Sequence, residues 1–170
     1  MKVLYHGSHT EVNAPLAKAG RRNLDFGQGF YLTRLRTQAE SWAAIVAGRK
    51  GRKVKGHVSV FRFDESRAVA DGVRFKRFEA YDIEWLDYVV DCRRGKDVSG
   101  EYDIVEGGVA NDNVIDTVED YEKGIITAEQ ALGQLRYKSV NHQICILSQQ
   151  VIDRYLEFVE CLIIQSEEDM

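Results

Sequence analysis

Segments of alternating apolar and polar residues occur toward both ends of the chain. Of all the sequence features, this pattern limits the possible fold classes most strongly, because it requires β-strands in both halves. Six such segments, rich in β-branched residues, predict strands. They are residues 2–6, 28–33, 54–63, 102–105, 143–147 and 156–164. No internal repeat or low-complexity linker divides the 170 residues. We therefore expect one α+β domain over residues 1–165 and a solvated acidic tail over residues 166–170.

Helical spacing of apolar residues occurs between these segments. Four helices are predicted on this basis. They cover residues 37–48, 79–92, 127–135 and 149–155. In the first, Thr37 and Glu40 have the spacing of a capping box, and Gly48 is expected to end the helix. Its predicted apolar face contains Ala39, Trp42, Ala43 and Val46.

Charge is distributed unevenly along the chain. The net charge is only −4, but residues 1–77 hold 16 Lys and Arg against 6 Asp and Glu, whereas residues 78–170 hold 7 against 21. Such a polarised chain predicts an anionic ligand or partner for the basic part. Residues 49–55 contain five Lys and Arg and form either a solvated loop or a surface that attracts an anionic acceptor or nucleic acid.

Cysteine spacing and hydropathy exclude several classes of protein. Cys92, Cys145 and Cys161 are widely spaced, and none stands in a C-x-x-C pair or at metal-ligand spacing from a histidine. We therefore expect no metal site and no disulfide framework. Residues 1–7 lack the apolar run of a signal peptide, and no segment is as long as a membrane span. A cytoplasmic protein without membrane association is the natural expectation.

Two motifs contain polar and aromatic residues that a simple strand pattern does not require. Residues 5–8 read YHGS, in which an imidazole is followed by a glycine whose missing Cβ lets a ligand approach the backbone. Residues 25–33 read DFGQGFYLT, which directs one ring of the Phe-Tyr pair to the core and the other to the opposite face. Trp42 follows Tyr31 by eleven residues. Two rings from adjacent elements can clamp a flat heterocycle.

Together the two motifs resemble the nicotinamide-binding signature of ADP-ribosyltransferases of the diphtheria toxin and poly(ADP-ribose) polymerase type. They also resemble a bacterial family of unknown function that is thought to share this fold. The resemblance implies a split β-sheet core with flanking helices, and NAD as the substrate. In such enzymes a His, a Tyr and a Glu come from three successive strands.

The resemblance also implies roles for individual residues. His6 would bind the adenosine-side ribose, the backbone of Gly7 would hold the nicotinamide carboxamide, and Tyr31 would stack on the nicotinamide ring. Trp42 matches a second stacking aromatic. Arg22 either contacts the pyrophosphate or is a solvated loop residue, and Asp25 either borders the ligand or only caps its turn. The NAD-binding set is then His6, Gly7, Ser8, Arg22, Asp25, Gly29, Tyr31 and Trp42.

The third catalytic position departs from the family pattern. The strand at 143–147 begins with Gln143 where the family has its glutamate, so the implied catalytic set is His6, Tyr31 and Gln143. A carboxylate there stabilises the positive charge that develops on the ribose as nicotinamide leaves. Glutamine keeps the reach and an accepting carbonyl but carries no charge and is no base. Loss of one such partner costs on the order of a hundred- to a thousandfold in rate.

Several functions remain open at this point. The protein is either a slow mono-ADP-ribosyltransferase for a protein or nucleic-acid acceptor, or one whose acid is Glu101, Asp103 or Glu106 instead. The alternative is an inactive NAD-binding or interaction module, such as one component of a bacterial toxin–antitoxin pair whose acidic part docks a small partner protein. His142, next to Gln143, is a reserve candidate for the site.

Overall fold

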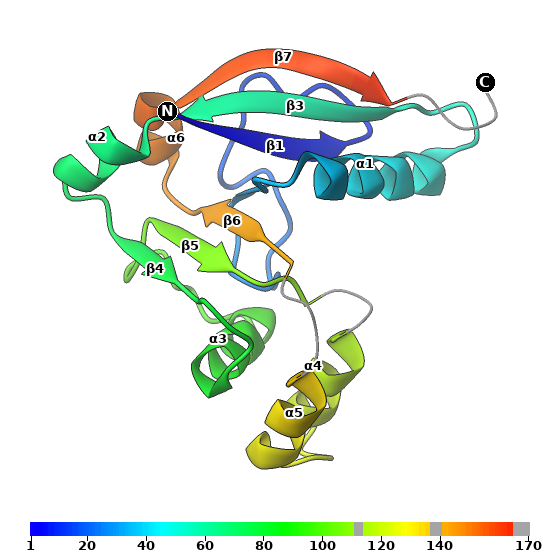
Figure 1. The fold of residues 1–170 in the computed structure, drawn as a ribbon, viewed down its shortest axis with the longest axis vertical. Helices are drawn as coiled ribbons and strands as arrows, with labels where there is room; N and C mark the ends of the chain where they lie inside the picture. The colour runs from blue at the N-terminus through cyan, green and yellow to red at the C-terminus, as the bar shows by residue number, and fades with distance from the viewer. Residues whose placement is uncertain (111–113, 137–140, 165–170) are drawn as a thin grey trace.

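Seven strands form two sheets within residues 1–110, 114–136 and 141–164, the part of the chain that the computed structural model describes (Figure 1). The first sheet is antiparallel, and its strands in spatial order are β1 (Lys2–Ser8), β3 (Gly56–Phe63) and β7 (Leu156–Ile164). The second sheet has the order β2 (Phe30–Leu32), β6 (Gln143–Ile146), β5 (Ile104–Gly107) and β4 (Phe75–Arg77). In this second sheet β4 and β5 are parallel, and the other neighbours are antiparallel.

Within the described part of the chain, one isolated residue pair joins the two sheets edge to edge. Tyr5 of β1 lies opposite Thr33, which directly follows β2. The Tyr5 N–H donates to the Thr33 carbonyl at 2.8 Å, and the Thr33 N–H donates back to the Tyr5 carbonyl at 2.9 Å. The chain is thus a mixed α/β single domain whose sheet is split between β1 and β2.

Helices pack on one face of each sheet. The described helices are α1 (Arg36–Lys50), α2 (Glu65–Ala70), α3 (Ile83–Arg93), α4 (Ile115–Glu122), α5 (Ala128–Leu135) and α6 (Gln149–Tyr155). In Figure 1, α1 lies along the first sheet, whereas α3, α4 and α5 gather beside the second. The fully buried Trp85 of α3 is the largest side chain of the core on this face, and Val118 of α4 and Leu135 of α5 complete it.

The Phe-Tyr pair of β2 divides its rings between the two cores, as predicted. Phe30 packs with Leu4 and Phe61 in a core between the sheets, whereas Tyr31 packs against the core beneath α3. The cause is the alternation of side chains along a strand. Adjacent residues of β2 and β6 therefore serve opposite faces of the sheet.

The first helix differs from its prediction at its start, at its end and on its buried face. It continues past Gly48 to Lys50, and Gly51 is its C-cap. Its N-cap is Leu35, which makes no side-chain capping bond, so the expected box of Thr37 and Glu40 is wrong. Glu40 instead pairs with Arg36 at 2.7 Å. The buried residues are Ala39, Ala43 and Ala47, whereas Trp42 is 50% exposed. Small residues dominate this face because the helix backbone lies close to the sheet.

Other elements agree with their predictions to within a few residues. Thr127 and Gln130 form a capping box at α5, and β7 spans residues 156–164 as expected. The short elements α2, β4 and α4 had no sequence signal strong enough to predict them. The acidic tail expected over 166–170 lies outside the described residues.

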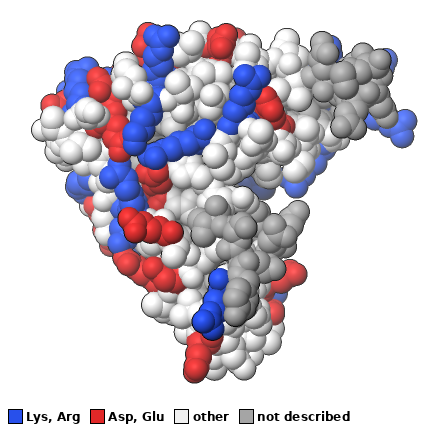
Figure 2. All heavy atoms as spheres, viewed as in Figure 1, with Lys and Arg blue, Asp and Glu red and all other residues white. Residues whose placement is uncertain are grey.

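The basic and acidic parts of the sequence pair with each other inside the fold. Arg34 and Arg77 both contact Glu106, at 2.9 Å and 3.1 Å. Arg74 contacts Asp103 at 2.9 Å. Figure 2 shows Lys, Arg, Asp and Glu intermingled on the side of the molecule that carries α2 and β4. Part of the uneven charge is therefore neutralised within the protein.

Candidate functional site

The split between β1 and β2 brings the first two motifs together. Beyond the Tyr5–Thr33 pair the two strands separate, and the ring of His6 bridges the gap. Its Nδ1 lies 2.6 Å from the carbonyl oxygen of Tyr31. The ring also lies against Phe30, with the ring centroids 4.5 Å apart. The YHGS and DFGQGFYLT motifs thus form the two sides of one split.

His6 is neutral, and its tautomer follows from its partner. Burial lowers the pKa of His6 below its ordinary value, and this outweighs the opposing effect of the hydrogen bond to Tyr31. Because a carbonyl oxygen can only accept, Nδ1 carries the hydrogen and donates it. The other ring nitrogen, Nε2, is therefore a hydrogen-bond acceptor.

Gly7 directs its backbone groups toward the same split. Alternate residues of an antiparallel strand direct both their N–H and C=O groups to the same neighbouring strand. Because Tyr5 directs both groups to Thr33, Gly7, two residues further on, directs its own groups to the side where β2 has separated. The split therefore presents a donor and an acceptor side by side.

The missing Cβ of Gly7 serves a different purpose from the one expected. A Cβ at Gly7 would lie 2.3 Å from the carbonyl oxygen of Ala39 and 3.0 Å from the amide nitrogen of Ala43. The glycine thus allows α1 to lie directly on β1, rather than admitting a ligand over its α-carbon. Gly29 plays a similar part, since a Cβ there would lie 2.5 Å from the Sγ of Cys145.

Tyr31 is held at its hydroxyl by the turn that precedes β2. The hydroxyl donates to the Gly27 carbonyl at 2.6 Å and accepts from the Phe26 N–H at 3.1 Å. Burial raises the pKa of Tyr31 well above its ordinary value, so the phenol keeps its proton. The ring is half-buried and fixed at its far end.

Gln143 shares the face of the sheet on which Tyr31 lies. Tyr31 pairs with Cys145, and Gln143 stands two residues from Cys145 on the same strand. The two side chains are therefore diagonal neighbours on one face. The Gln143 amide nitrogen, Nε2, donates to Oδ2 of Asp25 at 3.2 Å and to the Gly108 carbonyl at 3.2 Å.

Asp25 connects Gln143 to the core. Its Oδ1 lies 3.2 Å from Nη1 of Arg93, and its Oδ2 also accepts from the Ala110 N–H at 2.9 Å. From the sequence, Asp25 is expected only as a turn cap or a ligand neighbour, and no role is predicted for Arg93 or Gly108. A pattern of residues along the chain contains no signal for these contacts, because they join segments as many as 118 positions apart.

The acids considered as replacements for the missing glutamate lie elsewhere. Glu101 is exposed and pairs with Lys96 at 3.9 Å, and Asp103 binds Arg74 at 2.9 Å. Glu106 bonds to Nε2 of His142 at 2.8 Å. Since Glu106 pairs with Ile144 across the strands, it lies on the opposite face from Gln143. Asp25 is the carboxylate in contact with Gln143.

Trp42 lies on α1, one turn beyond a residue that contacts the start of β6. Gln38, one turn earlier on the same flank of the helix, donates to the carbonyl of His142 at 2.6 Å. Trp42 and Ile45 continue this flank and are half exposed, and the guanidinium of Arg49 lies 5.6 Å from the centroid of the Trp42 ring. The flank leads from the start of β6 to the cationic residues 49–55.

The remaining predicted contacts are placed less closely. Ser8 ends β1 opposite His57, one residue beyond the glycine at the split. Arg22 is exposed in the loop that precedes Asp25. Ser8 thus lies at the strand end next to the split, and Arg22 lies in the loop that leads to Asp25. Neither makes a described contact with Tyr31 or Gln143.

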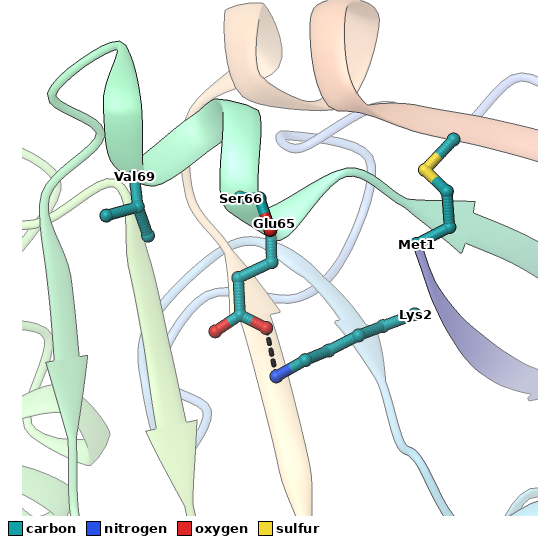
Figure 3. A pocket seen from close by; sticks show the side chains of 5 residues that line it. All are labelled: Met1, Lys2, Glu65, Ser66 and Val69. Carbon is teal, nitrogen blue, oxygen red and sulfur yellow. Dashed lines mark ion pairs between the residues drawn. The ribbon is translucent and has the colours of Figure 1, made fainter.

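A separate pocket lies at the other end of β1. It has a volume of about 500 Å³ and is lined by Met1, Lys2, Glu65, Ser66 and Val69. Figure 3 shows Lys2 and Glu65 paired across it. Lys2 and Gly7 stand five positions apart on β1, roughly 15–20 Å along an extended strand. This pocket is therefore distinct from the split.

The fold and this site define a mixed α/β single domain with a polar and aromatic site at a sheet split. Residues 2–158 match the DUF3990 family, described as proteins of unknown function, and the chain belongs to that family. No curated protein and no solved structure matches the chain. Among the described residues, the helices are too short or too polar to cross a membrane.

Proposed function

We propose that the protein binds NAD at the split between β1 and β2 and transfers ADP-ribose to a macromolecular acceptor. Two observations support this proposal: the imidazole of His6 on β1 bonds to the main-chain carbonyl of Tyr31 on β2, and Gln143 of β6 shares a sheet face with the Tyr31 side chain. The resemblance of the two motifs to ADP-ribosyltransferases adds the identity of the ligand.

The residues present suit such a ligand. The adjacent N–H and C=O of Gly7 match the acceptor and donor of a carboxamide. The ring of Tyr31 offers a fixed aromatic face to a pyridine ring. The neutral His6 offers Nε2 as an acceptor for a ribose hydroxyl. These are the three contacts by which NAD would be held.

The proposed reaction is a substitution at the ribose. The bond between C1′ and the nicotinamide nitrogen breaks, and nicotinamide leaves with the bonding pair as a neutral molecule. An oxygen or nitrogen of the acceptor forms the new bond to C1′ and releases its proton to solvent. Positive charge develops on the ribose in between, so a nearby hydrogen-bond acceptor such as Oε1 of Gln143 lowers the barrier.

Calorimetric titration with NAD tests binding. We expect the unaltered chain to release heat, and His6→Ala and Tyr31→Ala to weaken binding about tenfold or more. Tyr31→Phe keeps the stacking face and should retain most of the affinity. His57→Ala, a matched histidine on β3, should change nothing. No heat from the unaltered chain, or equal affinity in all four variants, would contradict the proposal.

Incubation with labelled NAD and cell lysate tests transfer. Sustained incorporation of label into protein or nucleic acid supports a transferase. Binding of NAD without incorporation would instead identify the chain as a non-catalytic NAD-binding module, the alternative function considered from the sequence.

Nucleic acid is the favoured acceptor, and the flank of α1 is the observation behind it. Lys50, Arg52, Lys53 and Lys55 are exposed and, among the described residues, make no ion pair with a carboxylate. Arg34, by contrast, pairs with an acid. A half-exposed tryptophan beside a cationic segment suits a single strand, whose bases stack and whose phosphates bind cations.

Charge reversal tests this acceptor. The triple variant K50E/R52E/K53E should reduce modification of nucleic acid and weaken its dependence on salt concentration. The variant K18E/K123E/R154E changes the net charge equally at scattered exposed positions and serves as the control. If both variants behave alike, the cationic segment does not bind the acceptor.

A further inference from the structure

We propose that Asp25 is a positioning residue that fixes the amide of Gln143 and places the negative charge of the site behind it. This inference rests on the proposed function, because it assigns Oε1 of Gln143 to the ribose. It explains how a site without a glutamate on β6 can still contain a carboxylate.

The first step is the orientation of the amide. The two neighbours of Nε2 are a carboxylate oxygen of Asp25 and the carbonyl oxygen of Gly108, each at 3.2 Å. Both can only accept, so both hydrogens of the amide nitrogen point to them. These two contacts therefore distinguish the amide nitrogen, Nε2, from the amide oxygen, Oε1. Oε1 is consequently directed away from Asp25 and Gly108.

The second step is the rigidity of these acceptors. The Gly108 carbonyl also accepts from Nε1 of the fully buried Trp85 at 3.1 Å. Asp25 is held by Arg93 at 3.2 Å and by the Ala110 N–H at 2.9 Å. A group held by two fixed acceptors is preorganised, so it does not have to reorient during the reaction.

The third step is electrostatic. A carboxylate hydrogen-bonded to Nε2 polarises the amide and increases the negative character of Oε1. Gln143 thus transmits part of the charge that a glutamate would hold directly. During transfer neither residue gains or loses a proton. The C1′–nicotinamide bond breaks, the acceptor forms its bond to C1′, and the acceptor proton goes to solvent.

The contact between Asp25 and Gln143 has a consequence for Gln143→Glu, the substitution that would restore the glutamate of the family pattern. Gln143→Glu replaces the donor by a carboxylate that faces the carboxylate of Asp25 and the carbonyl of Gly108. Two like charges at this distance cannot both remain ionised without cost. Glutamate at position 143 is therefore expected to destabilise the fold unless it is protonated or position 25 carries an amide.

The test is a charge exchange between the two positions. We expect Gln143→Glu alone to lower Tm by roughly 5 °C and to lose transfer at pH 8, with Tm partly recovering as the pH falls. Asp25→Asn alone should reduce the transfer rate about tenfold or more while NAD affinity changes less than about threefold. The double variant D25N/Q143E should recover most of the lost Tm, because only the Gly108 carbonyl then still faces the new carboxylate as an acceptor, and it should restore transfer at least to the original rate.

Each outcome decides a separate question. Gln150→Glu adds the same carboxyl at an exposed position of α6 and should leave Tm and transfer unchanged. If Gln143→Glu alone is as stable and as active as the unaltered chain, or if Asp25→Asn does not rescue it, the inference is wrong. Failure of the unaltered chain to bind NAD would overturn the proposed function instead. The Tm values of the exchange would then still decide the Asp25–Gln143 coupling.

Discussion

Two adjacent residues at the start of β6 meet two different carboxylates on opposite faces of the sheet. His142 donates to Glu106 at 2.8 Å, whereas Gln143 donates to Asp25 at 3.2 Å. Each carboxylate side chain is 12% exposed, so burial does not distinguish them. Their partners do distinguish them, because Glu106 is held by two arginines and a histidine, whereas Asp25 is held by one arginine and by the amide of Gln143.

The contacts of Glu106 hold separate segments of the chain together, and we call this cluster the clamp. The Glu106 carboxylate binds His142, Arg34 and Arg77, and the two arginines also pair with Glu65 next to the first sheet. His142 accepts the Arg34 N–H at Nδ1, at 3.1 Å, so its hydrogen is on Nε2. These charged groups thus pair with one another within the protein. Glu106 therefore serves stability, whereas under the proposed function Asp25 acts on the ligand through the buried side chain of Gln143.

The largest expected effect comes from breaking the clamp with Glu106→Gln. Burial acts to raise the pKa of Glu106, but His142, Arg34 and Arg77 outweigh it and hold the pKa at about 2. We expect the free energy of unfolding at pH 7 to fall by up to about 3 kcal/mol. Urea titration measures this loss. NAD affinity should be unchanged, and a large loss of NAD affinity at full stability would reverse the comparison.

The pH dependence provides a second readout of the same variant. Because the folded pKa lies below the unfolded one, the contribution is complete above about pH 4.5 and is lost as the pH falls toward about 2. The Glu106→Gln variant should lack this loss. Glu101→Gln, an exposed acid with a distant lysine, serves as the control.

A smaller effect is expected from Arg93→Met on the other face. The methionine keeps much of the apolar stem but leaves Asp25 without its cation. We expect a loss of about 1–2 kcal/mol in stability, together with a reduced transfer rate. Chemical unfolding and label incorporation are measured in parallel. Reduced stability with an unchanged rate would place Asp25 in a second clamp rather than in the site.

His6 should give a weaker effect, visible as pH dependence. Its folded pKa is lowered by burial, so the unfolded chain binds more protons just below the ordinary histidine pKa of 6.5. Stability therefore rises with pH through this window and falls below it. We expect His6→Gln to remove that slope, whereas His57→Gln keeps it. An unchanged slope in His6→Gln would show that the imidazole is not buried as neutral.

The smallest change in stability is expected for Trp42→Ala. The ring is 50% exposed, so its removal should cost less than about 0.5 kcal/mol. If Trp42 stacks on the ligand, NAD affinity falls about two- to tenfold. If it binds only the acceptor, NAD affinity is constant and acceptor modification falls. Calorimetry and label incorporation separate the two roles.

Local pattern was sufficient for most of the strands and helices, whereas the roles of the site residues that it suggested stay predictions. Period-two alternation located β1, β3, β6 and β7, and the YHGS and DFGQGFYLT motifs indicated His6 and Tyr31. The pattern failed at α1, where Trp42 was placed on the apolar face. Burial there depends on how closely the helix approaches Gly7, which is a property of packing and not of helical period.

The sequence by itself determined which side chains are available: an imidazole, a fixed aromatic ring, a glycine at a strand end and a glutamine instead of an acid. Only the tertiary structure decided which carboxylate meets that glutamine. Asp25 and Gln143 are 118 positions apart and joined through a turn, a strand end and an arginine of α3. Such contacts depend on chain crossings rather than on spacing, because a hydrogen bond requires atoms to lie within about 3 Å, wherever they stand in the chain.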